Sequence, residues 1–274
     1  MALTPLGAAG YNRRMSEVDL TVERRDAVTV VRLDRPAKRN AINDRLLRAI
    51  ETLFARPPEG TRAIVLCSAG EHFCAGLDLS EHRDRSAFEV MQHSRWWHRA
   101  FERIQYGEVP VVAAMQGAVI GGGLELAAAT HVRVAERSAF YALPEGQRGI
   151  FVGGGATVRV ARLIGTGRMV EMMLTGRVYD AEEGQRLGLS HDLVEPGAAL
   201  PKAIALAERI AGNAPMSNYA VLHAIGRIAE MGANEGLFTE SLMAALVQTG
   251  PEVRERLQEF LDKRQKPTKP PRGT

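Results

Sequence analysis

The chain has 274 residues, of which 45% are hydrophobic and 24% are charged, as in ordinary globular proteins. No apolar run reaches the roughly eighteen residues that a membrane-spanning helix needs, so we expect a soluble protein with no membrane partner. The formal net charge is only +3, and the basic excess lies mainly in the tail from Lys263 onward, which argues against a nucleic-acid-binding body.

The few cysteines and histidines restrict the chemistry that the chain supports. Cys67 and Cys74 make no disulfide framework in a chain of this size, so we expect a reducing, cytoplasmic location. The seven histidines are scattered, and none pairs at the spacing of metal ligands, so we infer no metal. Residues 1–15 lack the pattern of a signal peptide, and we expect them to be a loose N-terminus.

The first elements of the chain are predicted from the spacing of apolar residues. Alternation of apolar and polar residues predicts two strands at 18–25 and 28–33, which form a hairpin. Apolar residues at helical spacing then predict a helix over 44–55, with Asn43 or Asp44 as its N-cap.

The segment 63–115 has the pattern of strand–helix–strand crossover units. Short apolar runs at 63–67 and 111–115 indicate buried strands, on either side of a long helix over 88–104. The repeated order of strand, glycine-containing turn, helix and strand is typical of units that place helices on a mostly parallel sheet. From residue 157 onward most segments have helical periodicity, interrupted by glycine and proline.

These features divide the chain into four parts. Residues 1–15 are the loose N-terminus, 16–200 form a core α/β domain, and 201–265 form a C-terminal helical domain. Residues 266–274 are rich in proline and lysine, and we expect a disordered tail.

Two glycine-containing segments, 72–79 and 116–126, each follow one of the buried strands. In the second, three glycines at 121–123 precede a helical stretch over 124–130. Free backbone N–H groups at a helix start favour developing negative charge, which suits an oxyanion site. A tight turn with close backbone packing explains a glycine run equally well.

Two carboxylates follow these strands and form a candidate acid/base pair. Glu125 lies in an otherwise apolar stretch over 124–129, where a charge is costly unless it is paired or used. Glu145 lies twenty residues on, beyond a predicted strand at 139–143. Glu125 is also explained as a first-turn acid that complements the helix dipole. Spacing alone favours an ordinary surface position for Glu145.

Four segments in order resemble motifs of the crotonase (enoyl-CoA hydratase/isomerase) superfamily, and the resemblance extends from about residue 18 to residue 264. They are R-P-A-K-R-N-A-I at 35–42, F-C-A-G-L-D-L at 73–79, G-G-G-L-E-L at 121–126 and Pro144-Glu145. The resemblance implies an α/β crotonase fold, in which stacked ββα units form a superhelix and a C-terminal helical region mediates trimerisation.

The resemblance also assigns roles to four residues. It implies that the backbone N–H groups of Leu77 and Gly122 form an oxyanion hole around a thioester carbonyl. Glu125 and Glu145 correspond to the two carboxylates that hold water in hydratases. The implied activity is that of an enoyl-CoA hydratase, which adds water across the α,β double bond of a short acyl-CoA. The division of roles between the two glutamates stays open.

Binding of the coenzyme is implied for a further set of positions. The resemblance places Lys38, Ala75, Asp78, Phe260 and Lys263 beside coenzyme A, although solvated surface positions also explain the two lysines. Coenzyme A is part of the substrate, so no separate cofactor is expected. The family further implies a homotrimer or a hexamer of two trimers, and a role in fatty acid metabolism.

A narrower resemblance concerns the acyl group. The segments 144–155, 93–98 and 174–180 resemble the methylthioacryloyl-CoA hydratase subgroup, and Val152 stands where many hydratases have proline. Hydration there is followed by release of methanethiol and by thioester hydrolysis. Alternatives are an isomerase, an acyl-CoA hydrolase, or a non-catalytic relative that binds acyl-CoA or RNA.

Three further side chains invite an interpretation. Trp96 and Trp97, on the predicted helix after the first glycine loop, are candidates for the wall of an acyl pocket, with core packing the expected role for at least one of them. Cys74 is interpreted as a small packed thiol, because no His or Asp pattern accompanies it as in nucleophilic catalysis.

Overall fold

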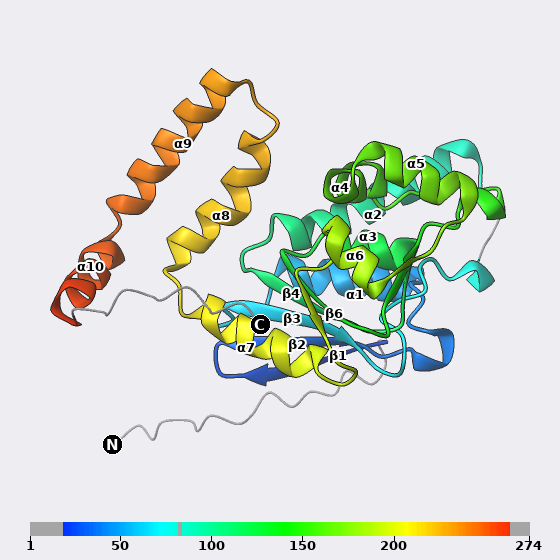
Figure 1. The fold of residues 1–274 in the computed structure, drawn as a ribbon, viewed down its shortest axis with the longest axis horizontal. Helices are drawn as coiled ribbons and strands as arrows, with labels where there is room; N and C mark the ends of the chain where they lie inside the picture. Colours follow the sequence, from blue (N-terminus) through cyan, green and yellow to red (C-terminus); the bar gives the residue numbers. More distant parts are fainter. Residues whose placement is uncertain (1–18, 82–83, 264–274) are drawn as a thin grey trace, which may run out of the picture. The chain divides into compact units, whose positions relative to one another are not determined.

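The structure, a computed structural model, describes residues 19–81 and 84–263. Within these residues the chain forms two compact units, the first ending at Ala211 and the second beginning at Gly212. The first unit holds both β-sheets, and the second is helical (Figure 1). Residue 18, the segment 1–15 and the tail 266–274, all of which entered the predictions, lie outside the described residues.

The larger sheet has six strands in the order β1-β2-β3-β4-β6-β9. The first pair is the predicted hairpin, antiparallel throughout its length, and every later neighbour in this sheet is parallel, as crossover connections require. The central strands are buried on both faces and therefore consist almost entirely of apolar residues. The strands are β1 (Leu20–Arg25), β2 (Val28–Leu33), β3 (Ala63–Ser68), β4 (Val111–Met115), β6 (Val132–Glu136) and β9 (Asp192–Val194).

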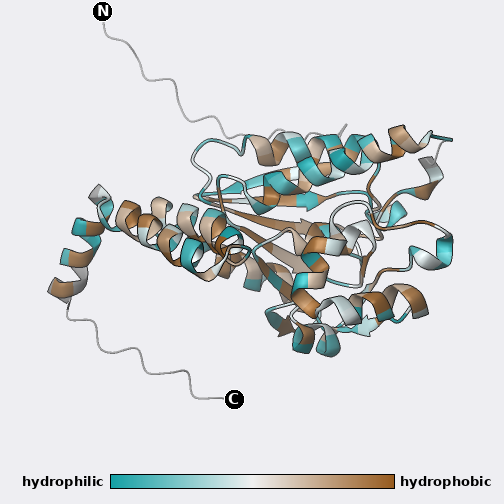
Figure 2. Ribbon diagram, turned by 90° about the horizontal axis from the view of Figure 1, so that it is seen from above, coloured by the Kyte–Doolittle hydropathy of each residue, from teal (hydrophilic) through white to brown (hydrophobic). Residues whose placement is uncertain are grey.

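One face of this sheet is covered by α7 (Ala199–Ala211). Its buried residues are alanines four positions apart, and small side chains at this spacing let the helix lie close to the strands. The first unit therefore extends through α7 to Ala211, and the expected boundary after residue 200 falls inside this helix. Figure 2 shows hydrophobic strands in the interior of this unit, between helices with mixed surfaces.

The opposite face carries the main core, beneath α1 (Asp44–Ala55) and α2 (Ala87–Gln105). The bounds of α1 are those predicted, and Asn43 caps it by accepting the backbone N–H of Leu46 at 2.9 Å. Ser86 begins α2 with a capping box. The predicted helix 88–104 is thus confirmed and extended by one residue at each end.

A second sheet of three short strands, β5 (Ala118–Ile120), β7 (Phe140–Ala142) and β8 (Tyr179–Asp180), fixes the position of the candidate site. β5 and β7 are parallel, with Ile120 beside Ala142. The residues that follow them therefore emerge at one edge of the sheet. These are α3 (Gly122–Ala128), which carries Glu125, and the turn that carries Glu145.

Helices complete both units. In the first unit, α4 (Ala156–Ile164) and α5 (Thr166–Thr175) lie between β7 and β8 in the chain, and α6 (Ala181–Leu187) follows β8. The second unit consists, over its described part, of α8 (Pro215–Ile228), α9 (Ala233–Gln248) and α10 (Pro251–Lys263), in agreement with the predicted helical final third. None of the helices in the described ranges is long and apolar enough to span a bilayer.

Candidate functional site

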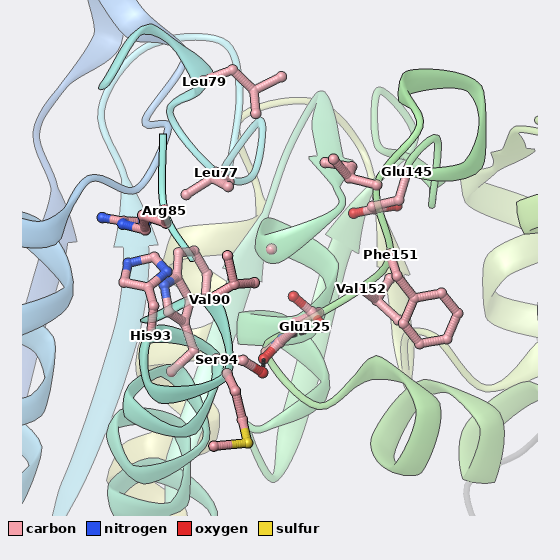
Figure 3. A pocket seen from close by; sticks show the side chains of 16 residues that line it. Leu77, Leu79, Arg85, Val90, His93, Ser94, Glu125, Glu145, Phe151 and Val152 are labelled. Carbon is pink, nitrogen blue, oxygen red and sulfur yellow. Dashed lines mark hydrogen bonds between the residues drawn. The ribbon is translucent and has the colours of Figure 1, made fainter. Parts of the chain in front are cut away.

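A cavity of about 450 Å³ in the first unit brings together the four residues that the sequence assigned to chemistry. Leu77, Gly122, Glu125 and Glu145 all line it (Figure 3). They come from the loop after β3, the start and first turn of α3, and the turn after β7. Segments far apart in sequence thus converge on one small volume.

The N–H groups of Leu77 and Gly122 are held close together by glycine packing. Gly76, with φ +91°, lies so close to α3 that a Cβ on it would be 2.8 Å from the Ile120 carbonyl oxygen and 3.1 Å from the Gly122 nitrogen. A Cβ on Gly122 would in turn lie 3.4 Å from the Leu77 nitrogen. Among the hydrogen bonds of the described residues, none uses the N–H of Leu77 or Gly122. Both donors are therefore available to an oxygen in the cavity.

Glu125 is a buried carboxylate, only 3% exposed, at the N-terminus of α4. Its Oε1 accepts the backbone N–H groups of Gly154 at 2.8 Å and Ala156 at 3.0 Å. Burial raises the pKa of Glu125, and the amides of Ala156 and Gly154 and the charge of Arg159 oppose this rise. These donors favour the charged form that burial disfavours.

The Glu145 carboxyl accepts fewer hydrogen bonds than that of Glu125. It is 7% exposed, and its Oε2 has no hydrogen-bond partner among the described residues. Burial raises the pKa of Glu145 to about 7, and the neighbouring charge of Glu125 adds to the rise. The Glu145 carboxyl therefore keeps its proton up to about neutral pH. The two carboxyls together can give one proton and take another.

The remaining wall of the cavity is largely apolar. Trp97 lines the cavity, and Trp96 does not. Instead, Nε1 of Trp96 donates to Glu51 at 2.7 Å. One of the two tryptophans thus forms part of the pocket wall and the other does not, in line with the sequence-based expectation. Phe151, 71% exposed, and Val152 form part of the other side (Figure 3). The lining is completed by Leu79, Arg85, Val90, Met91, His93, Ser94, Ile150, Gly153 and Gly154.

Lys38, Ala75 and Asp78, three of the residues expected to contact coenzyme A, do not line this cavity. Asp78 is buried, and its carboxylate binds Arg35 at 3.0 Å and Ser80 at 2.6 Å, so it fixes the loop that carries Leu77. Lys38 donates to the same Ser80 at 3.3 Å. Burial and hydrogen bonding thus direct Asp78 toward protein groups.

The other expected coenzyme contacts are Ala75, Phe260 and Lys263. The N–H of Ala75 donates to the Arg39 carbonyl at 3.0 Å. Phe260 and Lys263 belong to α10 in the second unit, and their side chains lie outside the part of the structure that is described. The binding roles of these five residues stay predictions.

The sequence did not reveal the side chains that bond the loop whose N–H groups donate to Glu125. Ser94 donates to the Gly153 carbonyl at 2.7 Å, and Arg159 donates to the Gly154 carbonyl at 2.9 Å. A usable signal existed for Arg159, because it is charged yet lies on the side of α4 that buries Ala156 and Val160. Ser94 has no such signal, since a serine within a helix usually faces solvent.

Cys74 belongs to the main hydrophobic core. Cys74 is fully buried, and burial raises its pKa to about 12, so its thiol is not activated, in agreement with the sequence-based interpretation. Within the described ranges, no group of three or more His, Cys, Asp or Glu side chains is arranged to hold a metal ion.

Comparisons with known proteins agree with this geometry. A model of the enoyl-CoA hydratase/isomerase family matches residues 23–269. The structure of a proposed enoyl-CoA hydratase from Rhodopseudomonas palustris CGA009 is 54% identical, with a TM-score of 0.88 over 90% of this chain and 95% of that one. Short-chain-enoyl-CoA hydratase of Clostridium acetobutylicum is 30% identical over 90% of this chain and 95% of its own length. The 2,3-dehydroadipyl-CoA hydratase of Escherichia coli is 31% identical over 90% and 96%, respectively.

Replacing Glu145 by Gln is expected to stabilise the fold at pH 8. The folded-state pKa of about 7 exceeds the ordinary value of 4.5, so the carboxyl destabilises the fold increasingly as pH rises from about 5 to above 7. Glu145→Gln removes this effect and should add about 1–3 kcal/mol to the free energy of unfolding at pH 8. Denaturant unfolding at pH 8 and pH 5 tests it. The gain should shrink at pH 5, and a variant no more stable than wild type at pH 8 would contradict the burial argument.

Adding one methyl group at Gly154 is expected to displace Glu125. A Cβ there would lie 2.6 Å from Glu125 Oε2 and 3.1 Å from Trp97 Cε3. Gly153→Ala is the matched control, because its Cβ would come no closer than 3.5 Å to any neighbour. We expect Gly154→Ala to lower kcat by about 10- to 100-fold, the scale of a misplaced catalytic group, and Gly153→Ala to change it little. Equal kcat values for the two variants would contradict this placement of Glu125.

Proposed function

Since the chain belongs to the enoyl-CoA hydratase/isomerase family and has the crotonase fold, we propose that it is an enoyl-CoA hydratase acting on a short acyl-CoA thioester. The observation that carries this proposal is the pair Glu125 and Glu145, both buried in one cavity with the N–H groups of Leu77 and Gly122. An oxyanion site and two carboxyls are the parts that addition of water to a conjugated thioester needs.

In the proposed reaction the thioester carbonyl accepts the N–H groups of Leu77 and Gly122. These donors stabilise the enolate that forms when water adds at C3. One carboxylate takes a proton from the attacking water, and one carboxylic acid gives a proton to C2. The net reaction adds H and OH across the double bond. The base has then gained a proton and the acid has lost one, and transfer of a proton between the two carboxyls or with solvent restores their starting states.

We assign the base to Glu125 and the acid to Glu145. Two amide donors on Oε1 and the N-terminus of α4 favour the charged form of Glu125. Glu145 Oε2 has no partner in the described residues, and the pKa of this carboxyl, raised by burial to about 7, keeps a proton available near neutral pH. We infer that the pair begins each turnover with Glu125 charged and Glu145 protonated. Burial raises the pKa of both, and the donors to Glu125 oppose that rise at Glu125.

The acyl group proposed is small and apolar, with 3-methylthioacryloyl-CoA as the leading candidate. Trp97, Val90, Met91 and Phe151 surround the cavity with apolar surface, which suits a short chain or a thioether. Water addition would put hydroxyl and methylthio groups on one carbon. That adduct loses methanethiol and leaves an aldehyde, and hydrolysis of the thioester would follow.

Other outcomes at the same site are alternatives to be tested. An isomerase would shift the double bond without water, and a hydrolase would attack the thioester carbonyl directly. A non-catalytic relative that binds acyl-CoA or RNA would need neither carboxyl. The cost of burying both Glu125 and Glu145 favours hydration, because each charge must be compensated unless it is used.

Further proposals concern the surroundings of the enzyme. Exposed apolar side chains on α9, among them Leu237 and Phe238, support a homotrimer or hexamer, since such surfaces are usually covered by another chain. Two buried free cysteines support a cytoplasmic location. We retain Lys38, Ala75, Asp78, Phe260 and Lys263 as proposed contacts with coenzyme A, with Asp78 acting through its loop.

Purified protein should consume both crotonyl-CoA and 3-methylthioacryloyl-CoA, with the higher kcat/KM for the latter. The measurement is loss of absorbance of the conjugated thioester, with products identified by mass spectrometry. Methanethiol and free coenzyme A are expected only from the second substrate. Glu125→Gln and Glu145→Gln should each lower the rate by about 100- to 10,000-fold, the usual contribution of a general acid or base. No loss of absorbance with either substrate would exclude hydration.

The kcat/KM for hydration should fall as pH rises above about 7. Burial raises the pKa of Glu145 to about 7, and above that pH the carboxyl no longer carries the proton that C2 receives. The slow Glu145→Gln variant should lack this fall, because an amide has no proton to lose there. A rate that instead rises through pH 7 in wild type would assign the role of base to Glu145.

A further inference from the structure

The loop before α4 contains two consecutive peptide groups whose carbonyls accept hydrogen bonds from side chains outside the loop. The peptide between Gly153 and Gly154 directs its N–H to Glu125 Oε1 at 2.8 Å. The carbonyl of that same peptide accepts the hydroxyl of Ser94 at 2.7 Å. Ser94 lies on α2. A residue of that helix therefore fixes the peptide group whose N–H donates to Glu125. In Figure 3 the Ser94 side chain points toward the Glu125 carboxylate.

The next peptide group is held in the same way. Its carbonyl, that of Gly154, accepts Nη1 of Arg159 at 2.9 Å. Its N–H is that of Gly155, a further backbone donor that favours the charged form of Glu125. The guanidinium is itself fixed, because Nε of Arg159 donates to Gln105 Oε1 at 2.7 Å. Arg159 is buried, so this arrangement is shielded from water.

Hydrogen bonding at the carbonyl of a peptide strengthens its N–H as a donor, because the two dipoles polarise one another. The same bonds fix the orientation of the peptide plane. Glycine at 153, 154 and 155 leaves these planes little intrinsic preference, so external bonds must set them. Glu125 therefore depends on side chains that do not touch it through any hydrogen bond of the described residues.

We propose that Ser94 and Arg159 are positioning residues for hydration, acting on Glu125 through the peptide groups 153–154 and 154–155. The inference rests on the proposed function and goes beyond it by adding two residues to its machinery. Ser94 acts through one neutral hydrogen bond. Arg159 adds a positive charge near the carboxylate, so its loss should have the larger effect.

The charged and titratable groups around Glu125 give the direction of the expected change. Burial opposes the charged form of Glu125, whereas the amides of residues 154–156 and Arg159 from α4 favour it. The charge of Glu125 in turn raises the pKa of Glu145. His98, one turn beyond Ser94 on α2, lies against Gly153, and burial lowers its pKa. Removing the Ser94 or Arg159 hydrogen bond weakens the donors that stabilise the charged form of Glu125. The pKa of Glu125 should therefore rise, so that it becomes protonated at a higher pH.

The test is the pH profile of kcat for Ser94→Ala with crotonyl-CoA. Loss of one neutral hydrogen bond should lower kcat by about 5- to 10-fold and move the acidic limb of the profile up by about half a unit to one unit. Arg159→Gln should move the limb further in the same direction. Arg159→Lys, which keeps the charge, should return part of that shift. KM should change little in the Arg159 variants, because Arg159 does not line the cavity. Ser94 does line it, so kcat at saturating substrate is the quantity compared for Ser94→Ala.

Ser86→Ala is the matched control. It also removes a serine hydroxyl from α2, by deleting the N-cap, but that serine contacts Glu89 and not the loop before α4. It should lower the melting temperature without moving the pH profile. Ser94→Ala with an unmoved acidic limb, or Ser86→Ala with the same shift as Ser94→Ala, would overturn the proposal. Wild-type protein that hydrates neither crotonyl-CoA nor 3-methylthioacryloyl-CoA would instead overturn the proposed function.

Discussion

The N–H of Gly121 donates to the carbonyl of Ala142 at 2.9 Å, and this bond joins the two segments on which the site depends. It continues the parallel pairing of β5 with β7, so α3 and the turn carrying Glu145 begin side by side. Parallel strands release their following residues at one edge, which is where ligands bind in open α/β sheets. The two carboxyls line one cavity because of this register, although twenty residues separate them in the chain.

Close backbone approach is the second constraint, and it explains the glycines better than turn formation does. A Cβ on Gly121 would lie 2.6 Å from Glu145 Oε1, and one on Gly154 would lie 2.6 Å from Glu125 Oε2. At both positions the absence of a side chain lets a glutamate carboxylate lie directly against the main chain. The packing that requires glycine at this turn also leaves the N–H of Gly122 without a bonded partner among the described residues, as the proposed oxyanion site needs.

The parts of the site that could be predicted from sequence are those with a local signal. Glu125 interrupts an apolar helix, so its residue type alone indicated it. The glycine-containing segments were also visible in the sequence, but the family resemblance was needed to single out Leu77 and Gly122 within them. Glu145 follows a strand of only three residues, and its burial comes from contacts that the local pattern does not encode; the ordered family motifs were needed. Ser94 meets Gly153 across fifty-nine positions, a pairing set by how α2 packs. The boundary after Ala211 was missed because an alanine-rich helix gives no sign of whether a sheet lies beneath it.

The groups that perform the proposed chemistry and those that set the acyl group come from different parts of the structure. Backbone N–H groups of Leu77, Gly122, Gly154 and Ala156 supply the donors, and a side-chain substitution elsewhere leaves them in place. The walls are side chains of α2 and of residues 150–152. Changing those walls alters which acyl group fits without altering the donors. Ser94 is the exception, because it lines the cavity and also holds the peptide that holds Glu125. A change of acyl group that required a new residue at this position would therefore also change the base.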